Sequence, residues 1–141
     1  GGVVAGADAR TCDALHDYGL NLGYAFQIAD DVLDYASDAA TMGKNLGDDL
    51  SEGKMTLPLI HAMAGADAPV RNRLGEIVEE GDVDGLAEVQ AAISAASSLD
   101  YSRMRAAGYA RAAELALDRF GDNDSVAALR GLARYAVDRD H

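Results

Sequence analysis

Apolar residues recur at helical spacing along almost the whole chain, and this periodicity limits the folds that the chain can adopt. No segment alternates apolar and polar residues for long enough to predict a sheet. Residues that favour helices, namely Ala, Leu, Glu and Arg, dominate the second half. The 141 residues are 49% hydrophobic and 26% charged, which is typical of one compact domain that buries most of its apolar surface. We therefore predict a single domain of the all-α class.

Capping residues predict where the helices begin and end. The first helix is expected from about Ala9, capped by Asp8, to about Tyr35. The next segment, SDAATMGKNLGDDLSEGKMT, is rich in Gly and acidic residues and is expected to be a loop; a loop of this length inside a compact domain is usually functional. Further helices are expected at 57–64 with Pro58 in the first turn, at 69–81, from Asp82 or Asp84 to 97, at 99–120 before Gly121, and at 125–138.

The charge balance excludes several classes of partner. With 24 acidic against 12 basic residues the net charge is -12, so nucleic acid and anionic membranes are repelled, and we expect no stable membrane insertion. Cys12 is the single cysteine, which excludes an internal disulfide framework and a metal site built from cysteines. Since the chain also shows no secretory leader, we predict a reducing, cytoplasmic location. The start, GGVVAGAD, lacks an initiator Met, and we expect the chain to be a fragment whose upstream half is missing.

Three aspartates share one face of the first predicted helix. At about 100° per residue, Gln27, Asp30, Asp31 and Asp34 fall within an arc of roughly 100°, opposite the apolar side chains. Repelling carboxylates destabilise a helix, and the nearby Gly19 and Gly23 cost about 1 kcal/mol each relative to Ala. One interpretation is a solvated acidic face with glycines for close packing. The other is a site for Mg²⁺, which is typically held by one or two carboxylates together with substrate phosphates.

The following loop supplies positive charge. Lys44 and Lys54 each follow a glycine, and glycine allows backbone amides to approach an anion, although an isolated lysine is more often simply solvated. The stretch DDLSE at 48–52 forms a second acidic cluster, which we interpret as a hinge or helix cap rather than a metal site.

Two stretches carry a family resemblance. GYAFQIADDVLDY, followed by MGKNLGDDLSEGKMTLPLIHAM, resembles the second aspartate-rich region of the trans-isoprenyl (polyprenyl) diphosphate synthases, and is most similar to the octaprenyl and decaprenyl long-chain type. A weaker likeness extends through SLDYSRMRAAGYARAAELAL to ALRGLARYAVDR. The resemblance covers the whole chain and implies the C-terminal half of an isoprenoid-synthase-type helical bundle.

The resemblance also implies roles for individual residues. Asp30, Asp31 and Asp34 match the DDxxD motif that binds Mg²⁺ bridging the allylic diphosphate. Phe26 and Gln27 match the pair that lies against the substrates near the developing carbocation. Lys44 matches a lysine that contacts the diphosphate, and Lys54 a loop lysine that helps to close the site. By this likeness Gln27, Asp30 and Lys44 are the catalytic candidates, whereas we expect His61 to be a packed helix residue.

The implied activity is a Mg²⁺-dependent prenyltransferase that condenses an allylic diphosphate with isopentenyl diphosphate. The intact protein is expected to be a homodimer. The first DDxxD motif and the basic residues that bind isopentenyl diphosphate belong upstream in this family, so we expect the 141-residue chain alone to be inactive. Product chain length cannot be predicted from these residues. Two alternatives stay open: a non-catalytic subunit that supports a separate synthase, and a structural helical module derived from the family.

Overall fold

A computed structural model of the chain describes residues 1–36 and 48–138, and every regular element in these ranges is a helix. The predicted all-α class is confirmed. The elements are α1 (Ala9–Ala36), α2 (Asp48–Ser51), α3 (Leu57–Gly65), α4 (Ala68–Glu80), the 3-10 turn η1 (Val83–Gly85), α5 (Leu86–Ala95), α6 (Ser98–Ala116), the 3-10 turn η2 (Asp118–Phe120) and α7 (Asp124–Tyr135).

Several helix ends follow from local capping chemistry. The backbone N–H of Thr11 donates to Asp8 Oδ1 at 2.7 Å, which confirms the predicted start of α1. Gly81 ends α4 in the left-handed conformation, with φ of 60°, as its position predicted. Two further caps were not predicted: the side chain of Asp67 accepts from Val70 N at the start of α4, and that of Asn123 caps α7.

The structure differs from the predicted elements in four places. The helix predicted from Asp82 or Asp84 to 97 divides into the 3-10 turn η1 and α5, which ends at Ala95. Residues Asp48–Ser51 form a four-residue helix where only loop was expected, because so short a helix has no detectable periodicity. The segment predicted as one helix at 99–120 divides into α6 and the 3-10 turn η2. The last helix ends at Tyr135 rather than near Asp138. The prediction for 37–47 lies outside the described residues.

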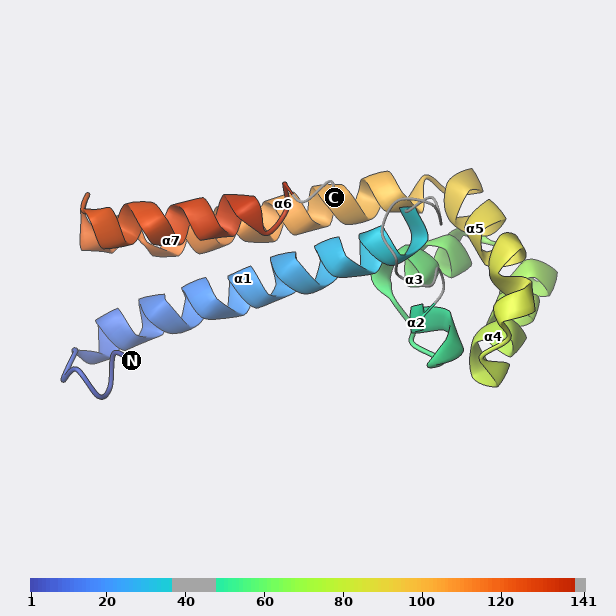
Figure 1. The fold of residues 1–141 in the computed structure, drawn as a ribbon, viewed down its shortest axis with the longest axis horizontal. Helices are drawn as coiled ribbons and strands as arrows, with labels where there is room; N and C mark the ends of the chain where they lie inside the picture. Colours follow the sequence, from blue (N-terminus) through green and yellow to red (C-terminus); the bar gives the residue numbers. More distant parts are fainter. Residues whose placement is uncertain (37–47, 139–141) are drawn as a thin grey trace. The chain divides into compact units, whose positions relative to one another are not determined.

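The chain divides into two compact units. Among the described residues, the first contains Gly1–Ala29 and 105–138. Its core is formed where α1, α6 and α7 pack together, as Figure 1 shows for these three helices. The buried residues of this core are Tyr18, Ala113, Leu117, Val126 and Ala133. The hydroxyl of Tyr18 donates to the backbone oxygen of Leu129 at 2.9 Å and so ties α1 to α7.

The second unit is Asp30–Met104, which begins with the last turns of α1 and contains α2 to α5 (Figure 1). Helix α3 packs against both α4 and α5, and α2 packs against α4. The buried core residues are Tyr35, Leu50, Leu59, Ala62, Leu74, Ile77, Val78, Val89 and Ile93. Because Tyr35 is part of this core, the acidic end of α1 is fixed within the second unit.

Candidate active site

The side chain of Lys54 joins two acidic segments of the second unit. Its Nζ donates to Asp31 Oδ1 on α1 and to Asp49 Oδ1 on α2, each at 3.0 Å. The side chain of Asp31 is only 8% exposed, that of Asp49 17% and that of Lys54 37%. One ammonium group therefore sits between two carboxylates that are largely withdrawn from water.

This environment changes the protonation equilibrium of Lys54. Partial burial by itself would lower the pKa of the ammonium group, but the hydrogen bonds and negative charges of Asp31 and Asp49 outweigh burial and raise the pKa above its ordinary value. Lys54 is consequently a fixed positive charge throughout the physiological pH range.

Close backbone packing places α2 at this site. Leu50 is fully buried in the core of the second unit. A Cβ atom on Gly81 would lie 2.7 Å from the backbone oxygen of Ser51, and one on Gly53 would lie 3.2 Å from that of Val78. Both glycines have positive φ, of 60° and 67° respectively. The end of α2 and the end of α4 thus lie so close together that only glycine fits at positions 53 and 81 without strain.

Backbone bonds then position Lys54 and Asp49. The N–H of Lys54 donates to the backbone oxygen of Asp49 at 2.9 Å, which closes the turn after α2. The N–H of Asp49 lies 3.4 Å from Asp34 Oδ2, which accepts a long hydrogen bond from it. The DDLSE cluster is therefore more than a cap, because Asp49 contacts both the motif on α1 and its lysine.

The structure places the other predicted site residues as follows. Asp30, Asp31 and Asp34 occupy the last two turns of α1, in the second unit, and Asp31 is buried. Phe26 and Gln27 lie earlier on the same helix, in the first unit, where Phe26 is 48% exposed. Lys44 lies outside the described residues. The ligand and catalytic roles of these residues stay predictions.

Within residues 1–36 and 48–138, no group of three or more His, Cys, Asp or Glu side chains is arranged to hold a metal ion by itself. At the acidic end of α1, the carboxylate of Asp31 instead converges with that of Asp49 on a single cation, the ammonium group of Lys54. Such a set suits a metal that takes one or two protein carboxylates and completes its shell elsewhere, as Mg²⁺ does with water and phosphate oxygens.

Sequence reasoning missed the part played by Asp49. Its neighbour Asp48 is exposed, and the two residues look equivalent in the stretch GDDLSEGK. A usable signal is the separation of five residues between Asp49 and Lys54 across Gly53, since a glycine turn can bring such side chains together.

His61 is a packed residue, as expected. Its ring stacks on Tyr101, with ring centroids 4.0 Å apart and planes 14° from parallel. Its Nδ1 lies 3.0 Å from Oγ of the fully buried Ser98. These contacts fasten α3 to α6 within the second unit, so they support the helix that follows Lys54.

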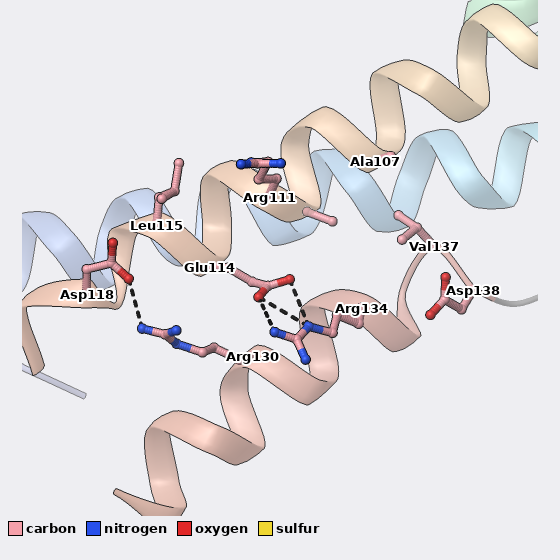
Figure 2. Close-up of a pocket in the computed structure, with 10 residues that line it drawn as sticks. Ala107, Arg111, Glu114, Leu115, Asp118, Arg130, Arg134, Val137 and Asp138 are labelled. Atoms are coloured by element: carbon pink, nitrogen blue, oxygen red, sulfur yellow. Dashed lines mark hydrogen bonds and ion pairs between the residues drawn. The ribbon is translucent and has the colours of Figure 1, made fainter. Parts of the chain in front are cut away.

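A separate groove of about 420 Å³ lies between α6 and α7 in the first unit. Figure 2 shows that its basic side chains face acidic ones: Arg134 contacts Glu114, and Arg130 contacts Asp118. The Arg134 partner holds the pKa of Glu114 below its usual value. This groove contains none of the predicted site residues, and its pairs neutralise one another.

Comparisons with known proteins agree with the motif. Residues 1–96 match the family model described as polyprenyl synthetase. The octaprenyl diphosphate synthases of Haemophilus influenzae and Escherichia coli are 42% and 44% identical over 140 residues, which are 99% of this chain and 43% of each relative. The chain therefore spans less than half the length of these relatives.

Solved structures show the same fold. The decaprenyl diphosphate synthase from Rhodobacter capsulatus superposes with a TM-score of 0.87 at 39% identity, over 99% of this chain and 44% of that one. The polyprenyl synthase from Caulobacter crescentus CB15, solved with calcium and isoprenyl diphosphate, has a TM-score of 0.80 at 44% identity, over 99% and 43%. Among the described helices, none is both long and apolar enough to cross a membrane. By sequence match and by fold, the chain belongs to the polyprenyl synthetase family.

Proposed function

We propose that this chain forms part of a prenyltransferase that joins an allylic diphosphate to isopentenyl diphosphate and so makes a longer polyprenyl diphosphate. The observation that carries the proposal is the convergence of Asp31, Asp49 and Lys54 at the end of α1, beside the aspartates that resemble the second aspartate-rich motif of the family. Membership of the polyprenyl synthetase family supports it, because the relatives described above are named octaprenyl and decaprenyl diphosphate synthases.

The carboxylates of Asp30, Asp31 and Asp34 are the residues that we propose to hold Mg²⁺. Their oxygen donors fit a hard cation, and the position that Lys54 occupies between Asp31 and Asp49 is one where positive charge is stabilised. When bound, Mg²⁺ would neutralise negative charge on the diphosphate leaving group.

The remaining residues act on the substrates directly. Lys44 and Lys54 bind diphosphate oxygens and stabilise the charge that develops as the allylic C–O bond breaks and its electron pair leaves with the diphosphate. Phe26 and Gln27 lie against the hydrocarbon end, where the double bond of isopentenyl diphosphate attacks the carbocation. Loss of a proton then restores a double bond in the lengthened product.

The proposal is tested with the full-length protein that contains this chain. Purified protein is incubated with radiolabelled isopentenyl diphosphate and, separately, with dimethylallyl, geranyl or farnesyl diphosphate as primer. We expect Mg²⁺-dependent incorporation of label into longer prenyl diphosphates, and its loss when EDTA removes the metal. The isosteric double variant Asp30→Asn/Asp34→Asn keeps the shape of the site and should lower the rate at least about a hundredfold.

Absence of incorporation with all three primers, from protein that is folded by circular dichroism, would contradict the proposed activity. A double variant as active as the wild type would instead show that the chemistry does not use the motif on α1. The homodimer and the cytoplasmic location implied by the resemblance stay predictions, to be checked by light scattering and by cell fractionation.

A further inference from the structure

The ammonium group of Lys54 lies against the acidic end of α1. Two of the three ammonium donors are used, one for Asp31 and one for Asp49, both at 3.0 Å. Because Asp31 is 8% exposed, its carboxylate has little access to water that could replace the ammonium group.

The contact brings together carboxylates from two different elements. Asp31 comes from α1, and Asp49 comes from α2, which the close approach of Gly81 to Ser51 fixes against α4. Without a cation between them, two partly buried carboxylates would repel each other in a region of low dielectric constant. Lys54 supplies positive charge at this contact.

We propose that Lys54 is a resident counter-cation which competes with Mg²⁺ for the carboxylate of Asp31, so that metal binding releases its ammonium group to the diphosphate. This inference rests on the proposed function and extends it. Asp49 becomes a positioning residue, because it holds Lys54 beside the motif until the metal arrives.

Competition has two consequences of opposite sign. Mg²⁺ alone must displace an ammonium group that has no new partner, so it binds weakly. When diphosphate is present, the displaced ammonium group gains a new anionic partner, so metal and diphosphate bind cooperatively. Removing Lys54 should therefore strengthen the binding of Mg²⁺ alone and weaken the cooperativity with diphosphate.

The test measures Mg²⁺ dissociation constants by calorimetry on the full-length protein, first alone and then with inorganic diphosphate, after correction for the complex that the two form in solution. In Lys54→Gln we expect Mg²⁺ alone to bind about tenfold more tightly, and the gain that diphosphate provides to shrink by about the same factor. Lys54→Arg keeps the charge and should resemble the wild type in both measurements.

Arg73→Gln is the matched control. Arg73 is an exposed residue of the second unit that pairs with Glu88 at 3.0 Å, so this variant also removes one positive charge from an ion pair. Its Mg²⁺ dissociation constants should stay within about twofold of the wild type, because the charge of Arg73 is exposed and screened, and its ion pairs are with Glu76, Asp82 and Glu88. An equal gain in affinity in Lys54→Gln and Arg73→Gln would overturn the inference, since net charge alone would then explain it.

Other results are equally decisive. Unchanged or weaker Mg²⁺ binding in Lys54→Gln contradicts competition, as does an absence of Mg²⁺ binding in every variant. If Lys54→Gln does not fold, wild-type protein labelled with ¹⁵N-lysine decides the matter: Mg²⁺ should abolish the protected ammonium signal that Lys54→Arg identifies, and a persistent signal overturns the inference. Prenyl transfer is assayed separately, so altered Mg²⁺ binding without product would contradict the proposed function alone.

Discussion

The ammonium group of Lys54 lies 3.0 Å from the carboxylate of Asp31, which stands 23 residues earlier in the chain. This single contact places the turn after α2 against the acidic end of α1. The two neighbouring aspartates of α2 differ in their surroundings. The side chain of Asp49 also accepts a hydrogen bond from Lys54, whereas Asp48 is exposed. We therefore expect the effect of removing a carboxylate at this site to depend on what that carboxylate contacts, and not on how many carboxylates its segment contains.

We predict that Asp30→Ala reduces turnover of the full-length protein far more than Asp48→Ala. Asp30 begins the motif proposed to hold the metal, and removing a group that stabilises developing charge costs roughly 2.7 to 4 kcal/mol, or about a hundred- to thousandfold in rate. Asp48 lies in the first turn of α2 with an exposed side chain, so its loss should be mild. Steady-state rates at saturating Mg²⁺ compare the two variants. Equal losses of rate would contradict the proposal that the aspartates of α1 hold the metal.

We predict that Gly81→Ala destabilises the second unit by about 1 to 3 kcal/mol. The new Cβ would lie 2.7 Å from the backbone oxygen of Ser51, and the φ of 60° is one that alanine rarely adopts. Urea unfolding gives the free energy change.

Gly75→Ala provides the control in the same helix. A Cβ there would meet only Met63 Cε, at an ordinary contact distance of 3.9 Å, and its backbone is helical. Alanine inside a helix is favoured over glycine by up to about 1 kcal/mol, so this variant should be as stable as the wild type or more stable. A similar loss in both variants would mean that the close approach to Ser51 is not the cause.

The sequence predicted long helices well, and short or distant features poorly, for physical reasons. Helix α1 has many turns of periodic apolar residues and a strong cap in Asp8, so its bounds agree within one residue. Helix α2 has four residues, which is little more than one turn and too few to show a period. Its presence depends on burial of Leu50 and on the approach to Gly81, which are tertiary effects.

At the site, too, one feature could be predicted from the sequence and another could not. The arc of carboxylates on α1 follows from helical geometry alone, and the motif on it indicated the family that the comparisons show. The link from Asp49 through Lys54 to Asp31 could not be predicted, because it depends on where α4 holds α2.

We predict that Ser98→Ala lowers stability by about 1 to 3 kcal/mol, because it leaves the Nδ1 of His61 without its buried partner at 3.0 Å. Ser102→Ala is the matched control on the same helix. Both serines are fully buried, but Ser102 Oγ makes no hydrogen bond within the described part of the chain, so its removal should be neutral or stabilising. Chemical denaturation of the two variants measures the difference, and an equal loss would exclude the Ser98 to His61 bond as the cause.

The last prediction concerns stability at alkaline pH. Burial raises the pKa of Tyr18 above its ordinary value of 10.0, and its hydroxyl donates to the backbone oxygen of Leu129, a bond that ionisation would remove. The folded state therefore holds this proton more tightly than the unfolded state does. The stability that it contributes is fully present below the unfolded pKa and is lost as the pH rises through the raised folded pKa.

Free energies of unfolding measured between about pH 8 and pH 11.5 should decline above about pH 10, by up to about 1.4 kcal/mol per pH unit for this one proton. Tyr18→Phe should be less stable than the wild type at pH 8 by about 1 kcal/mol, the usual value of one hydrogen bond. The difference between the two proteins should then shrink as the pH rises, because the wild type loses at high pH what the variant already lacks. A difference that stays constant across this range would mean that the pKa of Tyr18 is the same in the folded and unfolded states and that other groups cause the alkaline decline.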